Sequence, residues 1–424
     1  MLLSLKIENF RSIKGSLLLN FTTEKRLLKG DLEDNTFNVN GIELLHSLVI
    51  YGRNAAGKSN VIMAFKAIAY LIANSDTFKL DNKIEPYEPF LFDNNYKNAP
   101  VKFEIEFLGH ESKFVYKYLL EYNANEITRE ALYFYPEGVI SKLYDRNKDK
   151  ITYGDYYKGS KKTIEDDLLK NQLFLSKSSR NKVKFLDEVY LYFRKYIYIS
   201  TVNDTNYEES IIRSFAKQSL EDQKLKSNLL ELLKAADTNI QDIKITENAK
   251  NFKFPDNFPE KEKKDFLDKY KYEILTTHPL FENGNEIGKE LLELENESFG
   301  TKKFLAIGSL ILHTLDDGGV IIIDELDKGL HPLLTKLLIN LFNSKTNNPN
   351  NAQLIIATHD ITLLDNDILR RDQICFIDKG YDGGSILYKL SDIKGVRKDI
   401  PIDKWYLSGR FNAIPITSEI NLNF

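Results

Sequence analysis

The chain has 424 residues, a length that allows two or three domains or one elaborated domain with insertions. Apolar residues make up 42% and charged residues 28%, the proportions of an ordinary soluble globular protein with a substantial core. The net charge of −4 excludes the overall basic field that many nucleic-acid-binding proteins use, although composition leaves a local basic groove open.

The cysteine content and the hydropathy of the chain indicate its compartment. Cys375 is the only cysteine, so no intrachain disulfide can form, which suits a reducing cytosol. The first residues lack the basic-then-apolar layout of a signal peptide. No apolar run approaches the ~20 residues that a membrane span needs. We therefore expect a cytoplasmic protein with no membrane partner.

The first part of the chain is rich in predicted strands. In chain order they are expected at residues 3–8, 16–21, 48–51, 101–107, 116–122, 126–135 and 151–153. Gly109 and His110 mark the turn of a hairpin, and the apolar spacing after residue 59 is helical. We expect residues 1–155 to form a β-rich N-terminal lobe.

The middle of the chain has a different pattern. From about residue 160 to 245 the sequence is rich in lysine and glutamate, with helical spacing of leucines such as Leu229, Leu232 and Leu233. Residues 247–266 contain two prolines and a charge cluster, and we expect an exposed connection there. Residues 156–290 are therefore expected to be a mainly helical insertion.

The last part of the chain has an α/β pattern. Helices are predicted at about residues 304–315 and from Pro332, and strands at residues 320–323, 353–358 and 373–377. Continuous apolar strands that alternate with helices indicate parallel pairing, buried on both faces. We expect residues 291–424 to form a C-terminal lobe.

A complete phosphate-loop motif, G-x-x-x-x-G-K-[ST], lies between the apolar run 48–51 and the helical segment after it. Such a loop curls its backbone N–H groups around a phosphate at a helix N-terminus. The lysine then meets the β/γ oxygens and the hydroxyl ligates Mg²⁺. The chain is therefore expected to bind a nucleoside triphosphate and Mg²⁺ through Gly52, Arg53, Asn54, Ala55, Ala56, Gly57, Lys58, Ser59 and the adjoining Asn60.

Two carboxylates follow the apolar strand at residues 320–323. Asp324 can hold the Mg²⁺ shell together with Ser59, and Glu325 can orient and deprotonate the attacking water. An apolar run before two acids would by itself also fit a strand that ends in an ordinary exposed turn. The phosphate loop earlier in the chain favours the catalytic interpretation, because one motif predicts the other.

His359 and Ser298 complete the set of candidate residues. His359 follows the next strand, where ligands bind at the carboxyl ends of parallel strands, and it could contact the γ-phosphate. A surface histidine at a strand end is the alternative. Ser298 precedes an apolar helix as a good N-cap, so its role could be capping alone.

The order of these motifs resembles the ABC-type AAA ATPase heads of the SMC, RecF and OLD group. The matching stretches are Asn9 to Ser12, Gly52 to Ser59, Ser298 to Lys302, Asp324 to Asp327 and Thr358-His359. Further stretches look like the ATPases of phage-defence operons, closest to the RloA/AbiL type, with the AriA subunit of PARIS systems and PtuA as cousins. They are Pro89 to Leu91, Ala236 to Ile240, Glu297 to Thr301, Asp324 to Pro332 and Tyr406 to Phe411.

The resemblance implies a fold and a set of roles. The fold would be α/β, a P-loop NTPase of ABC-ATPase-head type, with mixed and parallel sheet and a helical insertion. Lys58, Glu325 and His359 would be catalytic, with His359 as the switch histidine, and Asp327 would be the D-loop acid. Ser298 and Gly300 would contact nucleotide in trans, and Arg11 would approach nucleotide as in related heads. Residues 298–301 read Ser-Phe-Gly-Thr, whereas transporters and SMC heads carry Ser-Gly-Gly-Gln at this place.

The resemblance also implies partners. Two heads would clamp two ATP molecules, binding would close the dimer, and hydrolysis would open it. The chain shows no effector chemistry of its own, so we expect a separate effector protein, encoded nearby, in anti-phage defence.

Gln172 is a candidate glutamine of the Q-loop, with a surface glutamine as its alternative.

Two other functions are weighed against this hypothesis. A RecF-like ATPase in DNA repair or maintenance, acting directly on DNA, would need a basic surface, for which the cluster over residues 176–184 is the best candidate. A transporter subunit is disfavoured by the missing Ser-Gly-Gly-Gln signature and by the long helical insertion. A GTPase is disfavoured because no Asn-Lys-x-Asp motif is present.

Overall fold

The computed structural model divides the chain into two compact units. The first comprises residues 1–201, 317–326 and 339–424, and the second comprises residues 202–316 and 327–338. The structure describes residues 1–24, 27, 32–136, 138–181, 183–201, 211–212, 214, 218, 222–247, 254–255, 258–269, 271–397 and 400–415.

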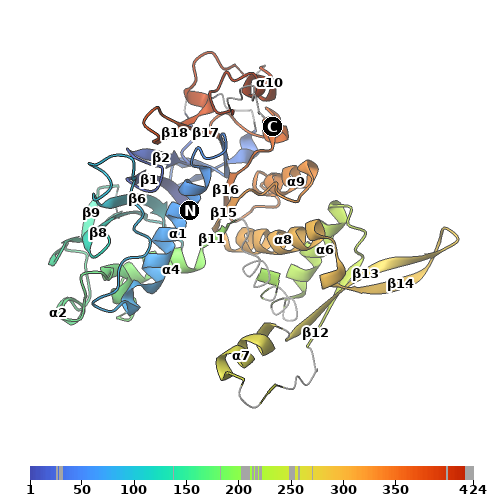
Figure 1. The fold of residues 1–424 in the computed structure, drawn as a ribbon, viewed down its shortest axis with the longest axis horizontal. Helices are drawn as coiled ribbons and strands as arrows, with labels where there is room; N and C mark the ends of the chain where they lie inside the picture. The colour runs from blue at the N-terminus through green and yellow to red at the C-terminus, as the bar shows by residue number, and fades with distance from the viewer. Residues whose placement is uncertain are drawn as a thin grey trace, which may run out of the picture. The chain divides into compact units, whose positions relative to one another are not determined.

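The first unit contains a seven-stranded antiparallel sheet in the order β10-β9-β8-β7-β6-β1-β2 (Figure 1). Buried and partly exposed residues alternate along β6 and β7, which is the period expected of strands with one face on a core. The strands are β1 Leu2–Glu8, β2 Leu17–Asn20, β6 Val101–Leu108, β7 Val115–Tyr122, β8 Ile127–Tyr135, β9 Ser141–Asn147 and β10 Lys150–Tyr153.

A six-stranded sheet, in the order β11-β15-β16-β5-β17-β18, forms the other layer of this unit. Neighbouring strands are parallel except for the last pair. Every residue of β5, β15 and β16 is buried, as the continuous apolar runs predict. The strands are β5 Ser47–Tyr51, β11 Ile197–Ser200, β15 Val320–Asp324, β16 Gln353–Ala357, β17 Ile374–Lys379 and β18 Ser385–Lys389.

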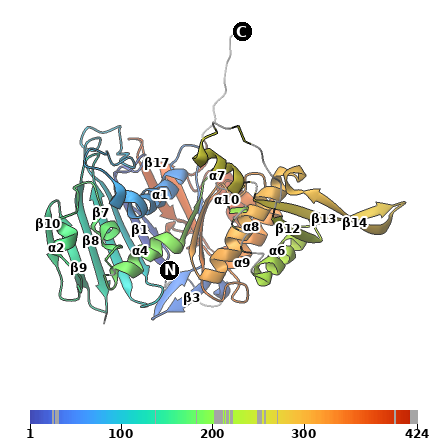
Figure 2. The ribbon, with the colours of Figure 1, turned by 90° about the horizontal axis from the view of Figure 1, so that it is seen from below.

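Helix α1, Lys58–Asn74, lies between the two sheets in both ribbon views (Figures 1 and 2). Its buried residues cover more than one face of the helix, as expected of a helix with a sheet on either side. The remaining elements of the unit are β3 Thr36–Val39, β4 Ile42–Leu45, α2 Lys162–Glu165, α3 Phe174–Ser178, α4 Leu186–Lys195 and α10 Ile402–Leu407, with the end of α9 Pro332–Phe342.

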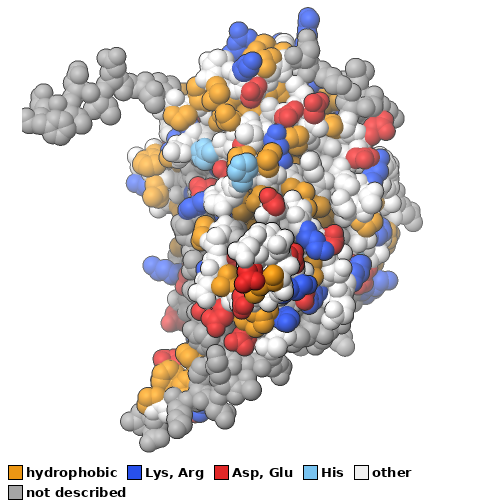
Figure 3. All heavy atoms as spheres, turned by 90° about the vertical axis from the view of Figure 1, so that its right-hand side faces the viewer, with side chains coloured by type: hydrophobic (Ala, Val, Ile, Leu, Met, Phe, Trp, Pro, Cys, Tyr) orange, Lys and Arg blue, Asp and Glu red, His pale blue; other side chains and the backbone are white. Residues whose placement is uncertain are grey.

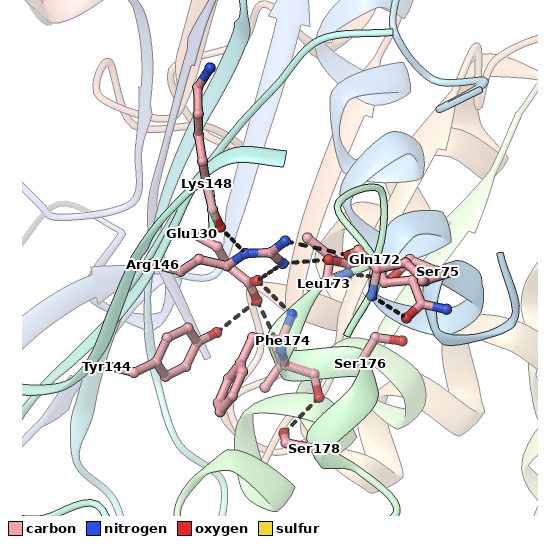
Figure 4. Close-up of polar contacts among 12 residues, drawn as sticks. Ser75, Glu130, Tyr144, Arg146, Lys148, Gln172, Leu173, Phe174, Ser176 and Ser178 are labelled. Atoms are coloured by element: carbon pink, nitrogen blue, oxygen red, sulfur yellow. Dashed lines mark hydrogen bonds and ion pairs between the residues drawn. The ribbon is translucent and has the colours of Figure 1, made fainter. Parts of the chain in front are cut away.

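A buried ion pair ties the seven-stranded sheet to the start of α3 and the residues just before it (Figure 4). The Glu130 carboxylate is fully buried and lies 3.8 Å from the guanidinium of Arg146. It accepts hydrogen bonds from the hydroxyl of Tyr144 and from the N–H groups of Phe174 and Leu175. Arg146 donates to backbone carbonyls, including that of Gln172. This network fixes the segment 169–175 on the sheet.

The second unit is a small sheet with helices. Strands β12, β13 and β14 are antiparallel, and the last two form a long hairpin. The elements are α6 Gln223–Ala235, β12 Asp242–Glu247, α7 Glu260–Lys269, β13 Tyr272–Glu282, β14 Asn285–Glu293, α8 Phe299–Asp317 and the start of α9.

The strands predicted on both sides of residues 156–290 are present, but the elements inside that range differ from the expectation. The three-stranded sheet at 242–293 was not predicted, and α7 begins inside the expected exposed connection. Strand β11 lies in the range expected to be helical and pairs with β15, so tertiary pairing overrides the local pattern there. Within the described residues, no helix has the length and apolar character needed to cross a membrane.

Candidate nucleotide-binding site

Three of the predicted motifs meet at one edge of the six-stranded sheet in the first unit. Parallel pairing sets Asp324 opposite Ala357, and Ala357 opposite Ile50. The N–H of Thr358 donates to the Ile50 carbonyl at 3.1 Å, and that of Glu325 donates to the Ala357 carbonyl at 2.9 Å. The carboxyl ends of β5, β15 and β16 therefore lie side by side, where ligands bind in parallel sheets.

The side chain of Lys58 joins the phosphate loop to the end of β16. Its ammonium group donates to the Gly52 carbonyl at 2.9 Å and to the Arg53 carbonyl at 3.5 Å. The same nitrogen lies 2.8 Å from Nε2 of His359. Lys58 is buried, whereas His359 is exposed. The ammonium group thus contacts two carbonyl oxygens of the loop and the imidazole nitrogen of His359.

The backbone of the loop requires glycine at two positions. Gly57 has φ 118°, and a Cβ atom on it would overlap Oγ of Ser385 and lie 2.7 Å from Oγ of Ser12. A Cβ atom on Gly52 would overlap the Ile377 carbonyl. Helix α1 begins at Lys58, within the phosphate-loop motif, so the loop leads directly into the first turn of a helix, the end at which helices bind phosphate.

Hydrogen bonds from two distant segments hold the loop in place. The hydroxyl of Ser385 donates to the Ala56 carbonyl at 2.6 Å, and the hydroxyls of Ser385 and Ser12 lie 2.7 Å apart. The amide of Asn60 donates to Oγ of Ser12 at 2.6 Å. Ser385 opens β18, and neither it nor Ser12 had been assigned a role from the sequence.

Arg11 and Arg53 are both held by carboxylates. Arg11 has φ 52° and forms a bidentate pair with Glu88, with N–O distances of 2.5 and 3.0 Å. Its other guanidinium nitrogen donates to Oδ1 of Asn60 at 3.4 Å. Arg53 pairs with Asp378 at 3.0 Å. Arg11 therefore reaches the first turn of α1, while its charge is already compensated by Glu88.

The oxygen atoms at this edge fit a magnesium ion. Asp324 is 9% exposed, and Ser59 lies exposed in the first turn of α1. Magnesium is usually held by one or two protein oxygens together with phosphate oxygens and water, and not by a cage of side chains. In the described part of the chain, no group of three or more His, Cys, Asp or Glu residues could hold a metal ion by itself.

Glu325 has a backbone conformation that is rare for a residue with a side chain. Its φ is 50°, and its N–H is bonded to β16, so the chain turns sharply at the end of β15. Strained residues of this kind cluster at functional sites. The turn leaves Glu325 partly exposed next to the buried Asp324.

Ser298 and Gly300 belong to the second unit, together with Asp327. Oγ of Ser298 accepts a hydrogen bond from the N–H of Thr301 at 3.1 Å, so Ser298 caps α8. A Cβ atom on Gly300 would lie 3.0 Å from the Gly329 carbonyl, so residues 298–300 pack against residues 327–329.

Gln172 is buried, so the interpretation as a surface glutamine is wrong. Its amide nitrogen donates to the carbonyls of Asp76 and Phe78, at 3.1 and 2.9 Å, just after the end of α1. These bonds give it a structural role at the opposite end of α1 from the phosphate loop.

The basic cluster over residues 176–184 is largely engaged within the chain. Lys177 pairs with Asp167 at 2.7 Å, and Arg180 pairs with Asp76 at 2.6 Å. Lys184 lies over the ring of Phe185, and Lys182 lies outside the described residues. These internal partners weaken the case for a DNA-binding surface here.

Solved structures with a similar fold are distant. An SMC head domain from Thermotoga maritima is 15% identical, with 92% of this chain and 98% of that chain covered and a TM-score of 0.42. The Smc head domain bound to the C-terminal domain of ScpA, from Pyrococcus furiosus, is 13% identical, with 92% and 96% covered and a TM-score of 0.43. The protein cbiO1 from Clostridium perfringens, part of the ABC transporter complex cbiONQ, is 14% identical, with 96% of this chain and 96% of that chain covered and a TM-score of 0.30. These likenesses are too distant to inform the function.

No curated protein matches the chain. One protein family does: the family described as "AAA domain, putative AbiEii toxin, Type IV TA system" matches residues 47–365. The match includes the phosphate loop, the acidic pair and His359, and with the parallel sheet it confirms the predicted P-loop NTPase fold. Since it spans well over half of the sequence, the chain belongs to this family of AAA-type ATPase domains.

Proposed function

We propose that this protein binds and hydrolyses ATP with Mg²⁺, dimerises head to head around ATP, and controls a separate effector protein in bacterial anti-phage defence, as its resemblance to RloA/AbiL-type ATPases implies. The contact between Lys58 and His359 carries the proposal. It joins the phosphate loop to a histidine far along the chain, at the sheet edge where Asp324 and Glu325 also lie.

The residues support a division of labour in hydrolysis. The N–H groups of the loop and the ammonium of Lys58 would bind the phosphate oxygens, and Ser59 and Asp324 would hold Mg²⁺, which neutralises developing negative charge. Glu325 would accept a proton from a water molecule while the oxygen atom of that water bonds to the γ-phosphorus. The bond from that phosphorus to the bridging oxygen breaks, which gives ADP and phosphate. His359 would contact the γ-phosphate and report its loss.

Dimerisation would complete the site. Ser298 and Gly300 open α8 in the second unit, and the helix begins with N–H groups that could meet an anion. In the proposed dimer they would contact the ATP bound by the other copy. Opening and closing of the dimer would then be the signal that a separate effector reads.

Purified protein tests the enzymatic part of the proposal. We expect the wild type to hydrolyse ATP only with Mg²⁺. Glu325→Gln should bind ATP, lose turnover, and elute as a dimer in size-exclusion chromatography only when ATP is present. Glu260→Gln, at an exposed position on α7, is the matched control and should behave as wild type. Hydrolysis by Glu325→Gln at the wild-type rate would show that another group is the base.

A cellular assay tests the biological part. We expect cells that carry this gene with its neighbouring genes to resist phage infection, and Lys58→Ala to remove the resistance. If Lys58→Ala cells resist phage as well as wild-type cells do, ATP does not drive a defence response through this protein.

A further inference from the structure

The β13–β14 hairpin extends beyond the sheet to which it belongs. Strand β12 pairs with β13 only as far as Thr277, opposite Asp242. From His278 to Glu290 the hairpin is a two-stranded ribbon, with no third strand among the described residues. Both ribbon views show it projecting from the sheet (Figures 1 and 2). Its tip is a tight turn in which Asn283 and Gly284 have φ 52° and 83°.

The projecting part carries large apolar side chains in contact with solvent. Leu280 is 39% exposed, Phe281 is 54% exposed and Ile287 is 57% exposed. Leu291, nearer the base, is 41% exposed. A two-stranded ribbon has no core of its own to bury such residues, and several exposed apolar side chains along one projection are typical of an interaction site.

The charge of the hairpin narrows the class of partner. Residues 278–293 contain four glutamates, Glu282, Glu286, Glu290 and Glu293, and a single cation, Lys289. The view onto the side where the hairpin projects shows acidic and apolar side chains next to each other (Figure 3). This negative charge repels nucleic acid, anionic membranes and the same hairpin of a second copy. It favours a protein with an apolar cleft and a basic rim.

The base of the hairpin is bonded to the start of α8. Nε2 of His278 lies 2.7 Å from Oε1 of Glu297, and the hydroxyl of Thr276 donates to the same oxygen at 2.5 Å. Glu297 directly precedes Ser298, the cap of α8. A shift of the hairpin would therefore act on the segment that is proposed to contact ATP in trans.

We propose that the β13–β14 hairpin is a docking arm that inserts its apolar tip into a basic-rimmed cleft of a partner protein, and that the His278–Glu297 contact links docking to the ATPase. The inference names the surface through which the proposed effector binds, so it rests on the proposed function. ATP hydrolysis by the purified protein alone does not depend on it, and its failure would leave the ATPase assignment untouched.

In-cell photocrosslinking tests the docking arm. The photoreactive residue p-benzoylphenylalanine replaces Phe281 in one variant and Ile287 in another, and Tyr381 in the control. Tyr381 is fully exposed in the β17–β18 turn of the first unit. We expect one protein to be crosslinked from both tip positions and not from Tyr381. That protein, once purified, should bind the wild-type chain with an affinity that falls as salt is added.

A charge-reversed pair tests the basic rim. Glu286→Lys with Glu290→Lys should weaken binding of the captured protein by more than about tenfold. Glu260→Lys with Glu262→Lys, on exposed α7, carries the same charge change and should bind as wild type. Both double variants should hydrolyse ATP without the partner, which shows that they fold. Crosslinks only to copies of this chain, the same capture from Tyr381, or unchanged binding after charge reversal would overturn the docking arm.

The link to the ATPase has its own test. The captured protein should change the ATP hydrolysis rate of the wild type. His278→Ala should still bind the partner but show a smaller change, because the imidazole no longer joins the hairpin to Glu297. An equal change in wild type and His278→Ala would overturn the coupling and leave the docking arm in place.

Discussion

The ammonium group of Lys58 lies 2.8 Å from Nε2 of His359, although 301 residues separate the two in the chain. A lysine ammonium has only donors, so the imidazole nitrogen accepts this bond. The carbonyl of Gly52 accepts another at 2.9 Å. The phosphate oxygens of a bound nucleotide would compete with these two acceptors for the hydrogen bonds of Lys58.

Lys58→Ala should strongly weaken ATP binding, because it removes the ammonium group that donates to the loop carbonyls. Loss of hydrogen bonds from a charged donor costs about 1.5–3 kcal/mol each, so we expect the Kd for ATP to rise by roughly 100-fold. Isothermal titration calorimetry measures it. Lys66→Ala, at an exposed position on the same helix, is the control and should bind normally. Equal affinities of the two variants would contradict the role of Lys58.

Ser385→Ala should weaken ATP binding without unfolding the protein. The variant removes the hydroxyl that donates to the Ala56 carbonyl and contacts Ser12, so the loop loses its support from β18. A lost neutral hydrogen bond costs about 1 kcal/mol, which corresponds to roughly a fivefold rise in the Kd for ATP.

Ser385→Thr keeps the hydroxyl and should therefore retain much of the affinity that Ser385→Ala loses. Ser16→Ala, at an exposed position, controls for the loss of a serine. Unchanged affinity in Ser385→Ala would mean that the loop is held without β18.

The strands around the site could be predicted because they are buried on both faces. Runs such as Val320–Ile323 are apolar without interruption, a pattern that few other elements produce. The β13–β14 hairpin was missed for the opposite reason. Asn283-Gly284 is a strong hairpin signal, but the residues beside it are exposed, and apolar and polar residues follow one another there without regular alternation, so no pattern reveals the strands.

The motif residues of the site could also be predicted, whereas the residues that support them could not. The residues of a phosphate loop are consecutive in the sequence, so the motif alone is enough to identify the loop. Ser385 reaches Ala56 across 329 residues, and the contact depends on the register in which β18 pairs with β17. Nothing near Ser385 in the sequence signals that contact.

Arg146→Met should destabilise the fold strongly while leaving the nucleotide site intact. It leaves the Glu130 carboxylate buried without its cation and removes donors from three backbone carbonyls. Breaking a buried pair costs about 3–5 kcal/mol. Urea unfolding measures the change in the free energy of unfolding.

Arg129→Met is the matched control for this buried pair. Arg129 lies on β8 beside Glu130 and pairs with Asp145 at 3.1 Å, but its side chain is 38% exposed. Exposed pairs contribute up to about 1 kcal/mol. If the two variants lose equal stability, the burial of Arg146 does not set the cost.

His46 should make the protein sensitive to acid. The ring is fully buried and packs on Phe37, and its Nδ1 accepts a hydrogen bond from the Asn348 amide at 2.8 Å. Burial lowers the pKa of His46 to about 4. The unfolded chain, with a pKa near 6.5, therefore binds more protons than the folded chain between these values, so stability falls as pH falls through this window.

His46→Leu removes this titration. Asn348 keeps two carbonyl acceptors, those of Phe342 and Ala352, so the variant leaves its amide satisfied. Between pH 7 and pH 5 the wild type should lose roughly 2 kcal/mol more stability than His46→Leu, measured by urea unfolding at each pH. Carboxylates titrate in both proteins and cancel in the difference. If the free energies of unfolding of the wild type and His46→Leu change with pH in parallel, His46 is protonated in the folded state or is reached by water.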